Sequence, residues 1–128
     1  MISGFHHVAM RVKDFDATVK FYTEILGFKK STAWGENDNR AIMLDTGSGD
    51  YLEVFAGGSD QLKPEGAFIH LAFRTDNCDE AIEKVRAAGM EITDEPKDVE
   101  IDSVPPTPVR IAFFKGPDGE VIEFFQNK

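Results

Sequence analysis

Two stretches of the chain alternate hydrophobic and polar residues at period two, one near the start of each half. Residues 7–12 read His-Val-Ala-Met-Arg-Val, and 63 positions later residues 70–75 read His-Leu-Ala-Phe-Arg-Thr. Such alternation is typical of a half-buried strand, so every second residue is predicted to share one face. The residues that recur in step are His7, Ala9 and Arg11 in the first stretch and His70, Ala72 and Arg74 in the second. The chain is therefore predicted to contain an internal repeat.

A helical pattern follows each of these strands. Apolar residues recur at helical spacing over 15–26, after Asp14 or Asp16 as a cap and before Gly27 as a left-handed stop. In the second half, Asn77 and Glu80 form a capping box ahead of an apolar stripe, and the next glycine ends the helix at position 89. One helix is therefore expected in each half.

The ends of the halves also correspond, at an offset of 70 positions. Each end is predicted to be a hairpin of two strands, with Gly49 and Gly119 as the turn glycines. The predicted strands are 40–44 and 51–55, and then 110–114 and 121–125. One further strand is expected before each hairpin, around 29–33 and 90–93, which gives two βαβββ halves.

Two irregular segments complete the organisation. Residues 56–66 are rich in Gly, Pro and Ser and are interpreted as the connection between halves. We expect a single domain over 1–128, with modules at about 1–57 and 67–128 and a linker at about 58–66. An acidic, proline-bearing insertion at 94–108 is predicted to be a long loop of the kind that often covers a binding site.

Four metal-capable side chains occupy equivalent places in the repeat. His7 and His70 stand early in the opening strands, and Glu53 and Glu123 stand between apolar neighbours in the closing strands. If each half curls its sheet and the halves pair by pseudo-symmetry, all four meet in one cavity. Imidazole and carboxylate together suit one divalent ion of Zn, Ni, Co, Mn or Fe. A single strand histidine is usually an ordinary core or surface residue, but the paired recurrence favours a metal site.

Each of four neighbouring residues has two possible roles. Arg11 and Arg74 share faces with the histidines, so they either bind substrate anions or balance nearby carboxylates. Phe55 and Phe125 lie two residues past each glutamate, so they either line the cavity or pack in the core.

Three further residues are expected to be outside the chemistry or weakly tied to it. His6 precedes His7 and is predicted to point to the opposite face in a structural role. Cys78 starts a helix, where a small buried residue is favoured over a nucleophile. Trp34 lies in a loop-like stretch and is a candidate lid.

Composition narrows the partners. The 128 residues, 41% hydrophobic and 29% charged, suit one soluble globular domain. A net charge of −9 argues against nucleic acid and anionic membranes as partners. No apolar run approaches the roughly 20 residues of a membrane span, and the N-terminus lacks the pattern of a signal peptide. The single cysteine fits a reducing compartment, so a cytoplasmic location is expected.

Taken together, these motifs resemble the vicinal oxygen chelate superfamily, which includes glyoxalase I, extradiol dioxygenases, fosfomycin-modifying transferases and bleomycin-binding proteins. The resemblance covers nearly the whole chain. It is carried by residues 7–12, by Phe-Tyr-Thr-Glu-Ile-Leu-Gly-Phe at 21–28, and by Gly-Pro-Asp-Gly at 116–119 with Ile122 and Glu123. It implies an α+β fold in which two βαβββ modules form a curved mixed β-sheet, a half-barrel around a metal-binding cleft.

The ligand set separates members of this superfamily. Glyoxalase I has His, Glu, His and Glu at the positions that match His7, Glu53, His70 and Glu123. Dioxygenases and fosfomycin transferases lack a ligand at the position of Glu53, methylmalonyl-CoA epimerases usually carry Gln there, and bleomycin-binding proteins generally lack the ligands. The resemblance therefore implies a glyoxalase I-like, or lactoylglutathione lyase-like, enzyme that isomerises a 2-oxoaldehyde–thiol adduct or related carbonyl compound through an enediolate.

In that reading Glu123 is the catalytic base and Glu53 shares the work, while Arg11 matches an arginine that holds the glutathione carboxylate. The asparagine expected shortly after the second ligand is absent, and Gly57 stands near its place, which points to another thiol adduct or a small carbonyl compound. The alternatives are an extradiol-type dioxygenase and a non-catalytic drug-binding protein of the bleomycin-resistance type. A homodimer is expected by analogy with the family, and the site then lies within one chain or is shared by two.

Overall fold

The computed structural model describes residues 1–61, 66–116 and 120–128. The first half contains strand β1 (Ile2–Arg11), helix α1 (Phe15–Lys20), and strands β2 (Lys29–Trp34), β3 (Ala41–Asp45) and β4 (Tyr51–Phe55). The second half contains strand β5 (Phe68–Thr75), helix α2 (Cys78–Ala87), and strands β6 (Glu91–Ile101), β7 (Thr107–Lys115) and β8 (Val121–Asn127). A π-helical turn, η1 (Phe21–Ile25), extends α1, and a 3₁₀ turn, η2 (Asn37–Asn39), precedes β3. The predicted order of two βαβββ halves is confirmed.

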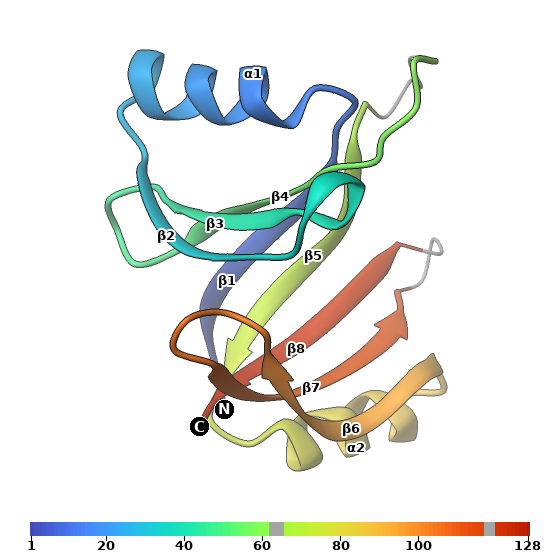
Figure 1. Cartoon of the computed structure of the whole chain (residues 1–128). Coiled ribbons are helices and arrows are strands. Elements are labelled where there is room, and N and C mark those ends of the chain that lie inside the picture. The colour runs from blue at the N-terminus through green and yellow to red at the C-terminus, as the bar shows by residue number, and fades with distance from the viewer. Residues whose placement is uncertain (62–65, 117–119) are drawn as a thin grey trace.

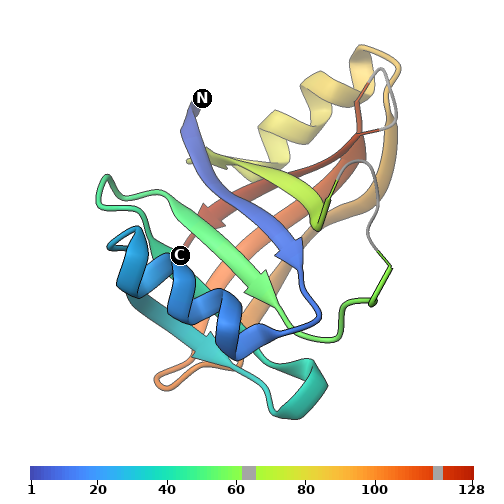
Figure 2. The same ribbon diagram turned by 90° about the horizontal axis from the view of Figure 1, so that it is seen from above.

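The described strands form one mixed sheet of eight in the order β2-β3-β4-β1-β5-β8-β7-β6. Strand β1 pairs with β4 in parallel, β5 pairs with β8 in parallel, and the two opening strands β1 and β5 run antiparallel at the centre. The sheet curls so that β2–β4 and β6–β8 turn toward each other (Figures 1 and 2). The expected curved half-barrel is therefore confirmed, and it places the opening and closing strands of both halves side by side.

Each helix begins where its capping residue predicts. The side chain of Asp14 accepts a hydrogen bond from the Ala17 amide at the start of α1, and Asn77 accepts one from the Glu80 amide at the start of α2. Gly27 and Gly89 follow the two helical segments with φ angles of +79° and +83°. No helix within the described residues is long and apolar enough to cross a membrane.

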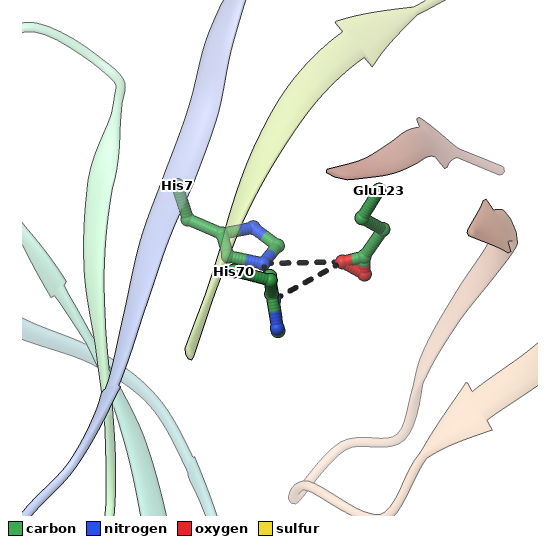
Figure 3. Close-up of side chains that lie close together, drawn as sticks. All are labelled: His7, His70 and Glu123. Carbon is green, nitrogen blue, oxygen red and sulfur yellow. Dashed lines mark hydrogen bonds and ion pairs between the residues drawn. The ribbon is translucent and has the colours of Figure 1, made fainter. Parts of the chain in front are cut away.

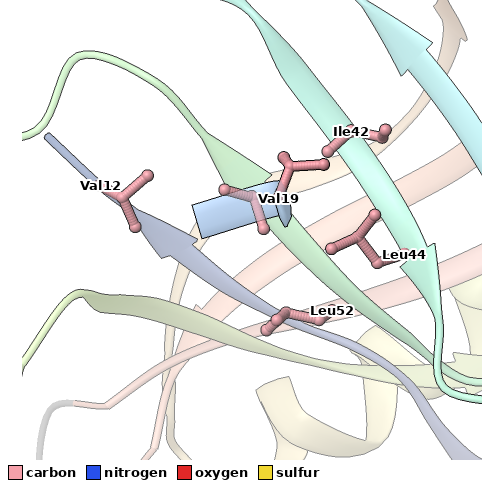
Figure 4. Close-up of a cluster of buried hydrophobic side chains, with 6 residues drawn as sticks. Val12, Val19, Ile42, Leu44 and Leu52 are labelled. Carbon is pink, nitrogen blue, oxygen red and sulfur yellow. The ribbon is translucent and has the colours of Figure 1, made fainter. Parts of the chain in front are cut away.

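The helices cover the outside of the sheet, and each seals a separate apolar core. In the first half, Val19 of α1 packs against buried residues of β3 and β4, among them Leu44 and Leu52 (Figure 4). In the second half, Ile82 of α2 packs against Ala112 and Phe124. These two cores lie on the helix side, and the opposite, concave face carries the polar side chains of the site beside a third, smaller apolar cluster that includes Ala72, Val109 and Phe125.

The acidic segment predicted as a long loop over 94–108 is largely a strand, so that prediction is wrong. Strand β6 continues to Ile101 and pairs with β7 from Glu91↔Lys115 to Ile101↔Thr107. Val99 and Ile101 alternate with charged residues and pack on the small core around Val109, which stabilises the extension. Only 102–106 connect the two strands. Gly119, the other predicted turn glycine, lies outside the described residues, whereas Gly49 occupies its turn at φ +83°.

Candidate metal centre

The candidate site is built from the four central strands β4, β1, β5 and β8. Two adjacent rows cross these strands, and each row has a glutamate at one end, a histidine at the other and a fully buried alanine between them. The rows are Glu53–Ala9–His70 across β4, β1 and β5, and His7–Ala72–Glu123 across β1, β5 and β8. In-register neighbours project to the same face of a sheet, so a methyl group separates each pair of larger side chains. The small alanines leave the space into which the four polar groups extend.

The tips of both imidazoles lie close to each other and to one oxygen of each carboxylate. The Nε2 atoms of His7 and His70 lie 3.0 Å apart. Glu123 Oε1 lies 3.2 Å from Nε2 of His7 and 3.6 Å from Nε2 of His70 (Figure 3). Glu53 Oε1 lies 3.3 Å and 3.5 Å from the same two nitrogens. The structure therefore brings together all four residues that the repeat singled out.

These separations suit a common ion. Two donors that are each about 2.1 Å from one ion lie about 3.0 Å apart at a right angle and about 3.4 Å apart at the tetrahedral angle. The distances from the histidine nitrogens to one another and to the carboxylate oxygens, 3.0–3.6 Å, match both. Among the described residues, the buried Oε1 of Glu123 accepts no hydrogen bond and lies within ion-pair distance of both imidazoles, so its charge is costly to bury unless a cation faces it. His7, His70 and Glu123 form a compact, mostly buried cluster of metal-binding type, so the residues fit a divalent ion.

The same geometry sets the charge of the metal-free cluster. Burial alone lowers the pKa of His7, but the adjoining carboxylates of Glu123 and Glu53 outweigh it and raise that pKa to about 9. Burial alone raises the pKa of Glu53, but hydrogen bonding and charge from His7 and His70 lower it to about 2. A proton on His7 thus balances the buried carboxylate, and a divalent cation can replace that proton.

His6 lies against His7, so the prediction that the two side chains diverge is wrong. Their Nδ1 atoms are 2.8 Å apart, and both side chains are buried. Burial, together with the charges of His7 and Arg74, lowers the pKa of His6 to about 3, so its imidazole is neutral. The only signal of this contact in the sequence is the His-His pair itself, and alternation in an ideal strand argues against it.

The two repeat arginines lie far apart. Arg11 stands at the end of β1 beside the start of β5, where its backbone amide donates to the carbonyl of Ala67. Arg74 stands near the other end of the same antiparallel ladder, since the neighbouring Thr75 pairs with Ile2. Arg11 donates to the carbonyl of Ala56, and Arg74 donates to the carbonyl of Gly49. One small substrate therefore cannot contact both.

The two phenylalanines of the closing strands also differ. The guanidinium of Arg11 lies 5.1 Å above the centre of the Phe55 ring, and Trp34 meets the same ring edge-on at 6.2 Å. Phe125 is buried, stacks on His6 at 3.8 Å and meets His7 edge-on at 5.2 Å. Phe125 thus packs on His6 and His7, whereas Phe55 packs beside the exposed side chain of Arg11.

Trp34 and Cys78, the two other residues of the sequence analysis, lie outside the cluster. Trp34 ends strand β2 and packs on Phe55, so it is part of the sheet rather than of a loop. Cys78 is fully buried at the start of α2, and burial with the charge of Asp79 raises the pKa of its thiol to about 11. A protonated, enclosed thiol is a poor nucleophile, in agreement with the expected packing role.

Comparison with known proteins identifies the family. The model of the glyoxalase/bleomycin resistance protein/dioxygenase superfamily matches residues 4–124. The chain belongs to this superfamily. The resemblance seen in the motifs is therefore confirmed. In this superfamily member, the curled sheet surrounds a cluster of two histidines and a glutamate.

Similar proteins match this chain over nearly its whole length. A protein of Bacillus subtilis (strain 168) called uncharacterized protein YwbC is 32% identical over 98% of this chain and 99% of its own length. The lactoylglutathione lyase of Haemophilus influenzae (strain ATCC 51907 / DSM 11121 / KW20 / Rd) is 33% identical over 95% of this chain and 91% of its own. Among solved structures, methylmalonyl-CoA epimerase from Mycobacterium tuberculosis is similar with a TM-score of 0.77 at 21% identity, covering 99% of this chain and 89% of that one.

Proposed function

We propose that this superfamily member is a metal-dependent isomerase of the glyoxalase I type, acting on a small 2-oxoaldehyde–thiol adduct or a related carbonyl compound. The observation that carries the proposal is the compact group of His7, His70 and Glu123, together with Glu53, whose Oε1 lies 3.3 and 3.5 Å from the same two histidine nitrogens. The likeness to lactoylglutathione lyases along nearly the whole chain supports the same reaction class. Four protein donors leave about two positions on an octahedral ion, enough for two neighbouring substrate oxygens.

We assign His7, Glu53, His70 and Glu123 as the residues that would hold the ion. When bound, a divalent ion polarises a substrate carbonyl and stabilises the negative charge that develops as a proton leaves the adjacent carbon. The donor set contains no thiolate, which favours Ni, Zn, Co, Mn or Fe over softer ions.

Glu123 is our candidate for the base that carries the proton between neighbouring carbons. Its Oε1 is buried and lies 3.2 and 3.6 Å from the two imidazole nitrogens, and we assign it the proton of a substrate carbon placed within about 3 Å. Glu53 is its pseudo-symmetric counterpart and shares the same two histidine neighbours. Because both carboxylates contact the same imidazoles, the protonation of one is expected to depend on the other. We expect Glu123 to carry most of the proton transfer and Glu53 a smaller part.

Arg11 is the better candidate for an anionic group of the substrate, because it is exposed beside Phe55 at one open end of the ladder. Gly57 lies next to it, at φ +81°, and a Cβ there would come within 3.0 Å of the Asp38 carbonyl oxygen. The backbone therefore keeps this position small, which fits a carrier other than glutathione where an asparagine is otherwise expected. Arg74 is held by the β3–β4 turn and is assigned a structural role.

The test is an assay of metal-reconstituted protein with methylglyoxal and a panel of thiols, glutathione included, with methylmalonyl-CoA and a catechol as further arms. The proposal predicts turnover with at least one thiol adduct, absent after chelation. Glu123→Gln is expected to lower kcat by a factor of about 100 or more while the protein still binds metal, and Glu53→Gln, the matched control, by less. Epimerisation of methylmalonyl-CoA or oxygen uptake with the catechol, without thiol-adduct turnover, would replace this proposal.

A further inference from the structure

His7 uses both of its ring nitrogens. Nε2 faces the other three donors at 3.0–3.3 Å, and Nδ1 faces Nδ1 of His6 at 2.8 Å. Two nitrogens at that distance share one proton, so one ring donates and the other accepts. If Nε2 of His7 is to bind a cation, the proton of the neutral ring must sit on Nδ1, and His6 must then be the acceptor.

A register shift and several ring contacts fix the position of the His6 side chain. Consecutive side chains of a regular strand point to opposite faces, but the pairing of β1 with β5 shifts register between Phe5 and His7. That irregularity turns the His6 ring toward its neighbour. The ring then stacks on Phe125 at 3.8 Å with an interplanar angle of 24°, lies 5.3 Å from Tyr51, and is only 4% exposed.

His6 also lines a small pocket of about 60 Å³. Thr32, Tyr51, Thr107 and Asn127 contribute polar side chains to the same pocket. Such a space is large enough for a water molecule, which would satisfy the remaining N–H of the ring. The imidazole of His6 can therefore present an unprotonated Nδ1 to His7 without leaving its own N–H buried and unpaired.

The second half has no equivalent of this arrangement. The residue before His70 is Ile69, and the ring that meets His70 is Phe113, edge-on at 5.4 Å. The pair is therefore not an automatic consequence of the repeat. It is a feature of the first half, beside one of the two imidazoles.

We propose that His6 is a positioning residue: its Nδ1 accepts the hydrogen bond from Nδ1–H of His7 and so fixes the ring and tautomer that offer Nε2 to the ion. This inference rests on the proposed metal centre. In metalloproteins, a ligating histidine generally donates its other ring N–H to an acceptor of this kind. Loss of that acceptor typically weakens metal affinity 10–100-fold.

Two substitutions at position 6 separate hydrogen bonding from packing. His6→Asn keeps an acceptor, because its amide oxygen is as many bonds from Cβ as Nδ1 is in histidine. His6→Phe keeps the stacked ring and removes the acceptor. Ile69→Val, a conservative change at the equivalent position before His70, is the matched control and is expected to behave as the parent protein.

Zinc affinity is measured at one pH by competition with a chelator, and long-range ¹H–¹⁵N spectra of the zinc-loaded protein report the tautomer of each histidine. The proposal predicts His7 protonated at Nδ1, affinity of His6→Asn within about threefold of the parent, and affinity of His6→Phe lower by 10–100-fold. A parent-like affinity for His6→Phe overturns it, as does equal weakening of both variants or a His7 protonated at Nε2. If His6→Phe does not fold, the parent spectrum and His6→Asn decide. A parent protein that binds no zinc refutes the metal centre itself, which is a different outcome.

Discussion

The two halves of the molecule agree in what they place on the concave face and differ in what stands behind it. Each half supplies a histidine, an alanine and a glutamate to the two rows of the site. Each also ties its helix to its sheet by an equivalent ion pair: Arg40 with Asp16 in the first half and Arg110 with Asp79 in the second. The repeat thus preserves both the donors and the contacts that orient their strands.

The differences lie away from the donors. Strand β6 has 11 residues where β2 has six, and it carries an additional acidic contact for Arg110 at Asp98. The first half has His6 behind its histidine, and the second has Ile69. Equivalent substitutions of the two spacing alanines should therefore have equal effects on metal binding, whereas substitutions at the supporting contacts that differ between the halves should have unequal effects.

The largest effect is expected at the alanines between the donors. Ala9→Val and Ala72→Val put two extra carbons into a fully enclosed space beside a glutamate and a histidine, so metal affinity should fall more than about 100-fold in both. Isothermal titration with Ni²⁺ measures it, and Ala33→Val, on an exposed position of β2, is the control. Normal binding by either row variant would mean that its row does not hold the ion.

A large and equal effect is also expected in the two cores. Leu44→Ala and Ile82→Ala each remove a buried side chain from one half and should each lower the free energy of unfolding by about 2–5 kcal/mol. Urea unfolding of both variants is expected to show a single transition, because β1 and β5 join the halves in one sheet. Two transitions, only one of which moves in each variant, would show that the halves fold independently.

A pH effect should separate His7 from the rest of the cluster. Its pKa is about 9 in the metal-free fold and lies near 6.5 in an unfolded chain, so its proton stabilises the fold below pH 6.5. That stabilisation is lost as the pH rises through 9. The melting temperature of the chelated protein is therefore expected to fall between pH 6.5 and 9, and His7→Gln should flatten this decline. An equally steep decline in the variant would assign it to other groups.

The smallest effect is expected at the ion pairs. Arg110 contacts Asp79 through two nitrogens, at 2.7 and 2.8 Å, and also contacts Asp98, whereas Arg40 has one contact with Asp16 and lies over the Phe15 ring. Arg110→Ala should lower the melting temperature by a few degrees and Arg40→Ala by less. Because the carboxylates are exposed, the difference should shrink in 1 M salt. An equal or reversed order would indicate that the additional contacts of β6 do not stabilise this half.

Much of this arrangement could be predicted from periodicity. The recurrence of His, Ala and Arg identified β1 and β5, the capping residues identified both helices, and the paired glutamates identified β4 and β8. Period-two reasoning could not detect the register shift that brings His6 onto His7, because it assumes a regular strand. It also missed the extension of β6, since acidic residues and prolines favour a loop locally and only the packing of Val99 and Ile101 outweighs them.

The spacing role of Ala9 and Ala72 was hidden for a different reason. Their recurrence was visible, but strand register across four chain segments decides which side chains they separate. The same holds for Arg11 and Arg74, which share a face by periodicity and yet lie at opposite ends of one antiparallel ladder. Residue patterns give the face of a strand, whereas the distance between equivalent residues depends on strand direction.

A crystal structure of the protein soaked with Ni²⁺, recorded at the nickel absorption edge, tests the central claim most directly. The account predicts one anomalous peak per chain, at about 2.1 Å from Nε2 of His7, Nε2 of His70 and a carboxylate oxygen of Glu53 and of Glu123, all from the same chain. A peak held by residues of only one half, or no peak among these four side chains, would contradict it.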